Sequence, residues 1–173
     1  MNARFLSLLG IITGAALIRI LPHPWNTTPI AAMALFAGSH FEKKWAAFLV
    51  PLCALFISDL VLGFYGSMGF IYACFALVVC IGIAIKGNRS PAIIAAGTLA
   101  ASLSFFALSN FGVWVSSGMY PHTGAGLMAC YVAALPFFQH TLLGDFAYTF
   151  LLFGIFRLAE REFPVLRPSP VNA

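Results

Sequence analysis

The chain has 173 residues, of which 61% are apolar and only 8% are charged, and its mean hydropathy is +0.96. A soluble domain carries about 25% charged residues, so this chain lacks the charge needed to cover a water-exposed surface. We therefore expect a membrane protein without a large soluble domain. The net charge of +4 comes from nine scattered Lys and Arg residues, which excludes the basic face of a nucleic-acid-binding protein.

The first three expected spans are separated by proline and by charge. Residues 4–21 form an apolar stretch that ends at Pro22, because proline bars a further helical turn. The second span, 28–41, begins after residues that can cap a helix and has Pro29 in its first turn. A short charged turn then leads into the third span, 45–64. The first and third stretches have 18 and 20 residues, close to the length of about 20 residues that crosses a bilayer.

The next three spans complete an all-α membrane protein. They cover residues 67–85, 92–116 and 139–158, and a Gly- and Pro-containing break separates the first two. The long connection 118–138 contains an apolar piece that is too short to span, and the tail 164–173 is expected to be disordered. These boundaries predict a six-helix bundle in a single integral membrane domain that covers residues 1–173.

The positive-inside rule predicts the orientation, because Lys and Arg accumulate in cytoplasmic loops. Six spans put both termini on the same side. With that side cytoplasmic, eight of the nine basic residues are inside and only Arg19 is outside. The eight are Arg4, Lys43, Lys44, Lys86, Arg89, Arg157, Arg161 and Arg167. We expect a multi-pass protein of the inner (cytoplasmic) membrane.

Polar residues inside the expected spans are concentrated toward the outside. Asp59 and Asn110 lie about 8 and 9 Å below the outer ends of their spans, and His140 and Asp145 lie in the outer half of the last one. Polar groups within a membrane are costly, so their convergence from three helices predicts an outward-open polar pocket. The alternative is that these side chains only join neighbouring helices.

Aromatic residues accompany this group. Phe106, Asn110 and Trp114 recur every four residues and so share one helix face. Tyr72 is also near the outer side, although part of this enrichment is expected from the interfacial aromatic belt. External loops over the pocket supply further candidate contacts, namely His23, Trp25, Thr28 and Tyr120.

Small residues and cysteines add two further candidate sites. Gly10 and Gly14 form a Gly-x-x-x-Gly face on which a partner helix can dock. Of four cysteines, all in apolar runs and expected to be free thiols, Cys80 lies about 20 Å from the outer end of its span. It can therefore form the floor of the pocket, where a thiolate binds transition metals.

Several segments together resemble the BtuM family of cobalamin-specific substrate-binding subunits, which are related to energy-coupling-factor (ECF) transporters. The resemblance covers nearly the whole chain. It is carried by residues 21–36 (LPHPWNTTPIAAMALF), Ser58 and Asp59, residues 104–114 (SFFALSNFGVW), Cys130 and Tyr131, residues 136–138, and Gly144 and Asp145.

The resemblance implies an S-component-like bundle of six helices that takes up vitamin B12, either with a shared ECF coupling protein driven by ATPases or without one. The family's first-helix motif is usually Ala-x-x-x-Ala, and here Gly10 and Gly14 stand in its place. The family also carries a cysteine proposed to bind the cobalt of cobalamin, and its position matches Cys80. Such a thiolate would also assist loss of the upper cyanide, which makes decyanation a possible activity.

Other functions fit the same sequence. One is an intramembrane cysteine enzyme that acts on a lipid or a corrinoid, although a nucleophilic cysteine needs a base within reach and no His is near Cys80 in sequence. Another is an S-component for a different vitamin. A third is a helix-packing partner with no ligand, which would leave the outer polar residues without a shared purpose.

Overall fold

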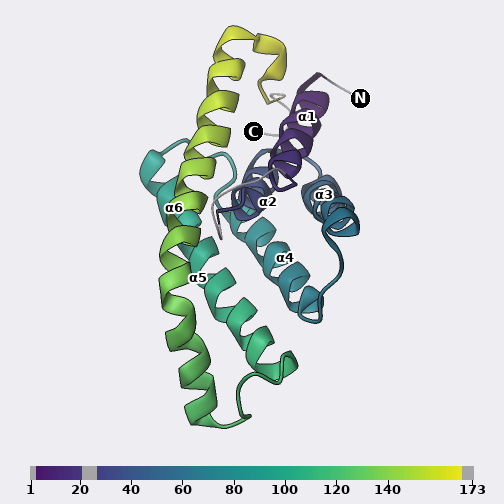
Figure 1. The fold of residues 1–173 in the computed structure, drawn as a ribbon. Coiled ribbons are helices and arrows are strands. Elements are labelled where there is room, and N and C mark those ends of the chain that lie inside the picture. Colours follow the sequence, from purple (N-terminus) through teal and green to yellow (C-terminus); the bar gives the residue numbers. More distant parts are fainter. Residues whose placement is uncertain (1–2, 21–26, 169–173) are drawn as a thin grey trace.

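The computed structural model describes residues 3–20 and 27–168, and these form six α-helices and one 3₁₀ helix with no strand among them. The elements are α1 (Ala3–Ile18), α2 (Ile30–His40), α3 (Lys44–Leu62), α4 (Met68–Ala84), α5 (Pro91–Ser116), α6 (Gly124–Glu162) and η1 (Pro164–Leu166), as Figure 1 shows. The all-α class is confirmed for the described part of the chain.

Three of these helices, α3, α5 and α6, are long and apolar enough to cross a membrane. The other three are also apolar but shorter, with 16 residues in α1, 11 in α2 and 17 in α4. At 1.5 Å per residue, α2 is only about 16 Å long, against a hydrocarbon core of about 30 Å. The helices thus fit a membrane protein, and the short α2 is enclosed by its neighbours.

Helix α2 forms the centre of the bundle, and every residue from Ile30 to Ser39 is buried. Small side chains let other helices approach it closely. A Cβ atom on Gly38 would lie 2.3 Å from the carbonyl oxygen of Val79, and one on Gly82 would lie 2.4 Å from that of Leu35. Helices α2 and α4 therefore cross with their backbones in contact, which only glycine permits at these two positions.

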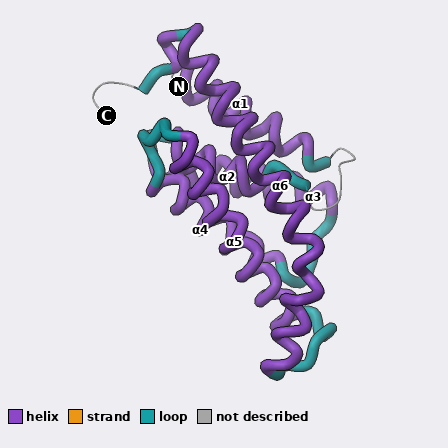
Figure 2. Tube along the Cα trace, turned by 90° about the vertical axis from the view of Figure 1, so that its left-hand side faces the viewer, coloured by secondary structure: helices purple, strands orange, loops and turns teal. Residues whose placement is uncertain are grey.

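Consecutive helices run in opposite directions, so the bundle has two distinct ends. Figure 2 shows the helices side by side, and α5 and α6 form a hairpin that extends past the other helices. The ends differ in the charged residues that they contain, and the end with Arg4 and Glu160 is called the charged end. Arg4 at the start of α1 contacts His40 at the end of α2 and Glu160 near the end of α6. The other end contains Arg19, which follows α1, and Asp59 of α3.

Two predictions from the sequence differ from the structure, one at the connection 118–138 and one at the C-terminal tail. The expected connection 118–138 is not a loop throughout, because α6 begins at Gly124 and continues for 39 residues through Pro136. Thr123 caps its start by accepting a hydrogen bond from the Gly126 amide. The apolar piece that is too short to span alone is instead joined to 139–158, because proline removes one helical hydrogen bond without ending this helix.

The expected disordered tail is the second difference. Pro164–Leu166 forms a turn of 3₁₀ helix, and Leu166 is buried. Its burial against α1 orders this segment, which contacts both α1 and α6. Residues 169–173 lie outside the described residues, as do residues 1–2 and 21–26.

Candidate functional site

Asp59 is the centre of a buried polar group at the end of the bundle opposite Arg4 and Glu160. Its side chain is completely buried, and Arg19 Nη1 lies 2.5 Å from its Oδ1 atom. The Tyr72 hydroxyl donates a hydrogen bond of 2.9 Å to the other carboxylate oxygen. Arg19 also donates to Ser58 Oγ at 2.6 Å. The group joins α3 to α4 and to the residues that follow α1.

The physical reason for this arrangement is that a buried carboxylate needs an opposite charge and hydrogen bonds to offset its lost hydration. From the sequence, Arg19 was expected only as the exception to the positive-inside pattern, and its pairing with Asp59 was not predicted. Tyr65, in the loop between α3 and α4, lies close to the same group. Burial raises the pKa of Tyr65, and the negative charge of Asp59 raises it further.

Asp145 forms a second buried group, between α5 and α6. Ser102 Oγ donates to Asp145 Oδ2 at 2.7 Å, and Asp145 is only 3% exposed. Thr149, one turn farther along α6, has a buried hydroxyl oxygen with no hydrogen-bond partner among the described residues. The neighbouring Gly144 lies against Thr27, where a Cβ would approach to 2.7 Å. This region therefore packs α6 closely against the segment before α2.

The remaining aromatic candidates lie along the α5–α6 hairpin. Asn110 donates its side-chain amide to the carbonyl oxygen of Phe106, one turn earlier in α5, at 2.8 Å. Phe106 packs on Tyr131 and Phe138 of α6, with ring centroids 5.6 and 4.7 Å apart. The Trp114 indole N–H donates a hydrogen bond to the Pro121 carbonyl in the hairpin turn. These contacts hold the two helices together.

The contacts of the described residues place the predicted pocket residues in separate groups. Asp59 and Tyr72 are together, Asp145 is paired with Ser102, and Phe106 and Asn110 belong to the hairpin. None of the hydrogen bonds or ion pairs among these residues joins Asp59 to Asn110 or Asp145. Asp59 and Asp145 thus each bond to a neighbouring helix, whereas the Asn110 amide bonds within α5.

His140, Thr28 and Tyr120 are more accessible than these buried groups. His140 is exposed on α6 and makes no hydrogen bond to another described residue. Thr28, just before α2, and Tyr120, in the hairpin turn, are half-buried. His23 and Trp25 lie outside the described residues.

The two cysteines of α4 differ in accessibility. Cys80 is exposed, whereas Cys74 is completely buried. The buried face of α4 contains Cys74, Phe75, Val78, Val79 and Gly82, so the Cys80 side chain belongs to a different side of the helix. Cys80 therefore does not lie in the helix-packing core, and anything that reaches it must approach the outer surface of α4.

Gly10 and Gly14 of α1 have free space around them. A Cβ atom built on either residue would meet nothing within 4 Å. No other helix of the described chain packs closely on these glycines, in contrast to Gly38 and Gly82. The face that was expected to receive a partner helix is therefore open.

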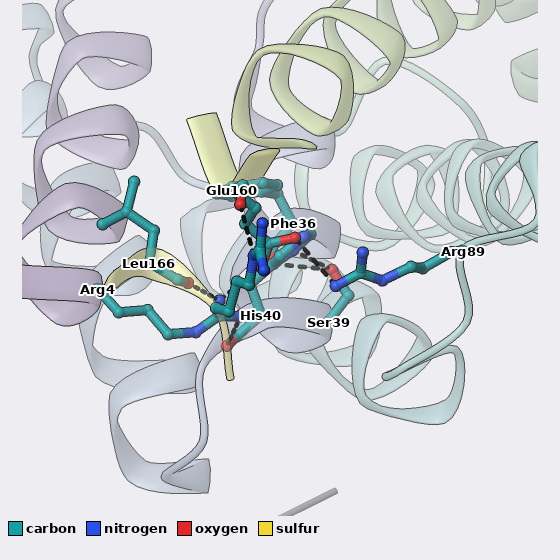
Figure 3. A network of polar contacts seen from close by, with 8 residues as sticks. Arg4, Phe36, Ser39, His40, Arg89, Glu160 and Leu166 are labelled. Atoms are coloured by element: carbon teal, nitrogen blue, oxygen red, sulfur yellow. Dashed lines mark hydrogen bonds and ion pairs between the residues drawn. The ribbon is translucent and has the colours of Figure 1, made fainter. Parts of the chain in front are cut away.

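The opposite end contains a charged network that the sequence analysis did not predict. The Glu160 carboxylate of α6 forms two ion pairs (Figure 3). One of its oxygens lies 2.6 Å from Arg4 Nη1, and the other lies 3.1 Å from Arg89 Nη2. Arg4 also donates to the carbonyl oxygens of Leu166 and His40. The sequence signal was weak, because Glu160 and Glu162 both stand among basic residues near the end of the last span.

A protein-family model described as a family of unknown function, DUF6580, matches residues 1–166. The chain belongs to the DUF6580 family. No curated protein and no solved structure matches this DUF6580 chain.

Proposed function

We propose that this DUF6580 protein binds cobalamin and carries it across the inner membrane. The resemblance of residues 21–36 and 104–114 to BtuM proteins motivates the proposal. The observation that carries it is that Cys80 lies off the buried face of α4, so a corrinoid seated against that side of the helix can bring its cobalt to the thiolate. The buried Cys74 on the same helix has no such access.

The chemistry of a thiol suits this role. A thiolate is a soft donor that favours transition metals, and on one axial face of cobalt it weakens the bond to the ligand on the other face. Cyanide is such a ligand in cyanocobalamin. We therefore include thiol-assisted decyanation in the proposal, with the electrons supplied by an external reductant. The exposed imidazole of His140 is the outer polar group most available to contact the vitamin.

The proposal also includes the topology of the chain. We propose that all six helices lie in the membrane with both termini in the cytoplasm. The gathering of Arg4, Lys86, Arg89 and Arg157 around one cavity at one end of the bundle supports this orientation. Arg19, the single basic residue expected outside, forms an ion pair with Asp59, which offsets the cost of its position.

Energy for uptake would come from a partner. We propose that an ECF coupling protein, driven by ATPases, docks on α1 at Gly10 and Gly14. The empty space around both glycines supports this contact, because small residues let two membrane helices approach closely. Substitution of both glycines by Leu is expected to abolish uptake in cells and leave cobalamin binding by the purified protein unchanged.

Visible absorption of the detergent-purified protein with cyanocobalamin tests the proposal. We expect the Cys80→Ala variant to lose the protein-induced change in the corrinoid spectrum. Cys53→Ala is the matched control, because Cys53 is also an exposed cysteine, on α3. It should retain the wild-type spectrum. Absence of corrinoid binding by the wild-type protein would refute the assignment to vitamin B12.

Two further results refine the outcome. Binding with identical spectra for wild type and Cys80→Ala would keep cobalamin as the ligand and remove the cobalt–thiolate contact. Decyanation is followed in the same cuvette after a reductant is added. Cyanocobalamin that stays unchanged after prolonged incubation with the wild-type protein would exclude this activity.

A further inference from the structure

A cavity of about 720 Å³ opens at the charged end of the bundle. It is bordered by the end of α2, the α4–α5 loop and the last turns of α6. Its lining contains four cationic side chains, those of Arg4, Lys86, Arg89 and Arg157, and two carboxylates, those of Glu42 and Glu160. None of these residues belongs to the proposed cobalamin site, so the cavity needs an explanation of its own.

The charges around this cavity are not balanced internally. Glu160 uses both oxygens for Arg4 and Arg89. Lys86 donates only to the backbone carbonyls of Phe41 and Glu42, at 2.8 and 3.3 Å. Four cations against two carboxylates leave a net charge of +2 on the lining. A basic cavity with an open mouth attracts an anion.

Arg157 adds to this excess, because its side chain donates only to the Arg89 carbonyl, at 3.3 Å. It forms no ion pair with any carboxylate in the described part of the chain. Arg89 is itself 57% exposed in its side chain and uses one guanidinium nitrogen for Glu160. Several N–H donors of these two side chains are therefore free for a ligand.

An independent observation concerns Arg4, whose side chain is only 8% exposed. Its Nε atom is buried and has no hydrogen-bond partner in the described residues. A buried, unpaired donor on a cation is costly, and Arg4 borders the cavity. Arg4 therefore carries a positive charge that the described chain satisfies only in part. The α5 helix also begins at this cavity, with Pro91 in the lining, and a helix N-terminus favours negative charge.

The other wall of the cavity is apolar. Ile94, Phe150 and Phe153 line it, and Phe150 is 46% exposed. On a helix that crosses the membrane, an exposed phenylalanine lies where acyl chains do. The cavity thus combines cations with an apolar side that is continuous with the bilayer-facing surface.

We propose that this cavity binds a phosphate group. Phosphate suits the lining because guanidinium groups offer paired N–H donors to its oxygens. The phosphate is carried by an anionic phospholipid, whose acyl chains would pass over Phe150, or is free in solution.

Native mass spectrometry of the full-length protein in detergent tests the proposal with three probes. They are phosphatidylglycerol, diacylglycerol with the same acyl chains, and inorganic phosphate. We expect phosphatidylglycerol to bind at least tenfold more tightly than diacylglycerol, which lacks the phosphate. Lys86→Gln together with Arg157→Gln should weaken phosphatidylglycerol binding by about tenfold for each cation removed.

A matched control variant carries Lys44→Gln and Arg161→Gln. Both residues are exposed basic residues at the same end of the bundle, outside the cavity lining, so phosphatidylglycerol affinity should stay within about twofold of wild type. Lys86 and Arg157 are also exposed and form no ion pair among the described residues, so the double variant should fold. Its melting temperature and elution volume verify this, and Arg157→Gln alone provides a milder variant.

Each outcome decides the proposal. Binding of inorganic phosphate with the same dependence on Lys86 and Arg157, without binding of phosphatidylglycerol, supports the site and assigns a soluble source. Equal affinity for phosphatidylglycerol and diacylglycerol would overturn it. So would phosphatidylglycerol binding that survives the double substitution or falls equally in the control, and so would binding of neither phosphate probe.

Discussion

Gly82→Ala tests whether the crossing of α2 and α4 holds the bundle together. The new Cβ would lie 2.4 Å from the carbonyl oxygen of Leu35 and 3.0 Å from the Cα of Gly38. A carbon–oxygen contact is normally about 3.3 Å or longer, so the helices must separate locally by roughly 1 Å. Both obstructing atoms belong to the backbone, and α2 is buried along nearly its whole length. No side-chain rotation can relieve the overlap.

The expected cost follows from two opposing effects. Overpacking of a well-packed interior costs about 1–3 kcal/mol, and a backbone obstruction places Gly82→Ala at the upper end. Alanine favours the helix over glycine by about 1 kcal/mol, which leaves a net loss of about 2 kcal/mol. For a chain of this size, the melting temperature should fall by about 4–8 °C.

Gly14→Ala is the matched control, because a Cβ there meets nothing within 4 Å. It should leave the melting temperature unchanged or raise it slightly. Thermal unfolding of both detergent-solubilised variants, followed by the loss of the monodisperse peak in size-exclusion chromatography, measures the difference. The reasoning is wrong if Gly82→Ala melts within 1 °C of wild type, or if Gly14→Ala loses as much stability.

Three other substitutions test the buried polar groups in the same thermal assay. Asp59→Asn should destabilise the protein by about 3 kcal/mol, because it leaves the Arg19 charge unpaired. Adding Arg19→Gln to this variant should recover part of the lost stability. A double-mutant cycle that shows no coupling between the two residues would contradict this. Glu160→Gln should cost at least as much, since it leaves two arginines without their carboxylate, and an unchanged melting temperature would count against that network. Ser102→Ala should cost about 1–3 kcal/mol by removing the hydrogen bond to buried Asp145, whereas Ser102→Thr should retain most of the stability.

Composition alone predicted a membrane protein, because a chain with so few charges cannot cover a water-exposed surface. The lengths of the apolar runs and the breaks at proline and charged turns also placed most helices close to their observed positions. The error at α6 arose from treating the segment before Pro136 as a loop. A proline within a long membrane helix removes one hydrogen bond but does not stop the helix when the next turns continue it.

The polar pairs were beyond prediction for a different reason. Arg19 and Asp59 are 40 residues apart, and Arg4 and Glu160 are 156 apart. Partners at such separations are set by how the helices pack, which no local pattern in the chain specifies. The same holds for Cys80, because its depth follows from counting residues, whereas the side of α4 that it occupies depends on where α2 lies.

The length of α6 has a mechanical consequence. A continuous helix of 39 residues is about 58 Å long, well beyond the roughly 30 Å hydrocarbon core. Its last turns are fixed to α1 by Glu160, and near its middle Gly144 lies against Thr27. The 20 residues before Gly144 then act as a lever about 30 Å long. A tilt of about 10° around that contact would move the hairpin tip by about 5 Å, so small rearrangements near the charged end would produce large displacements at the opposite end of the bundle.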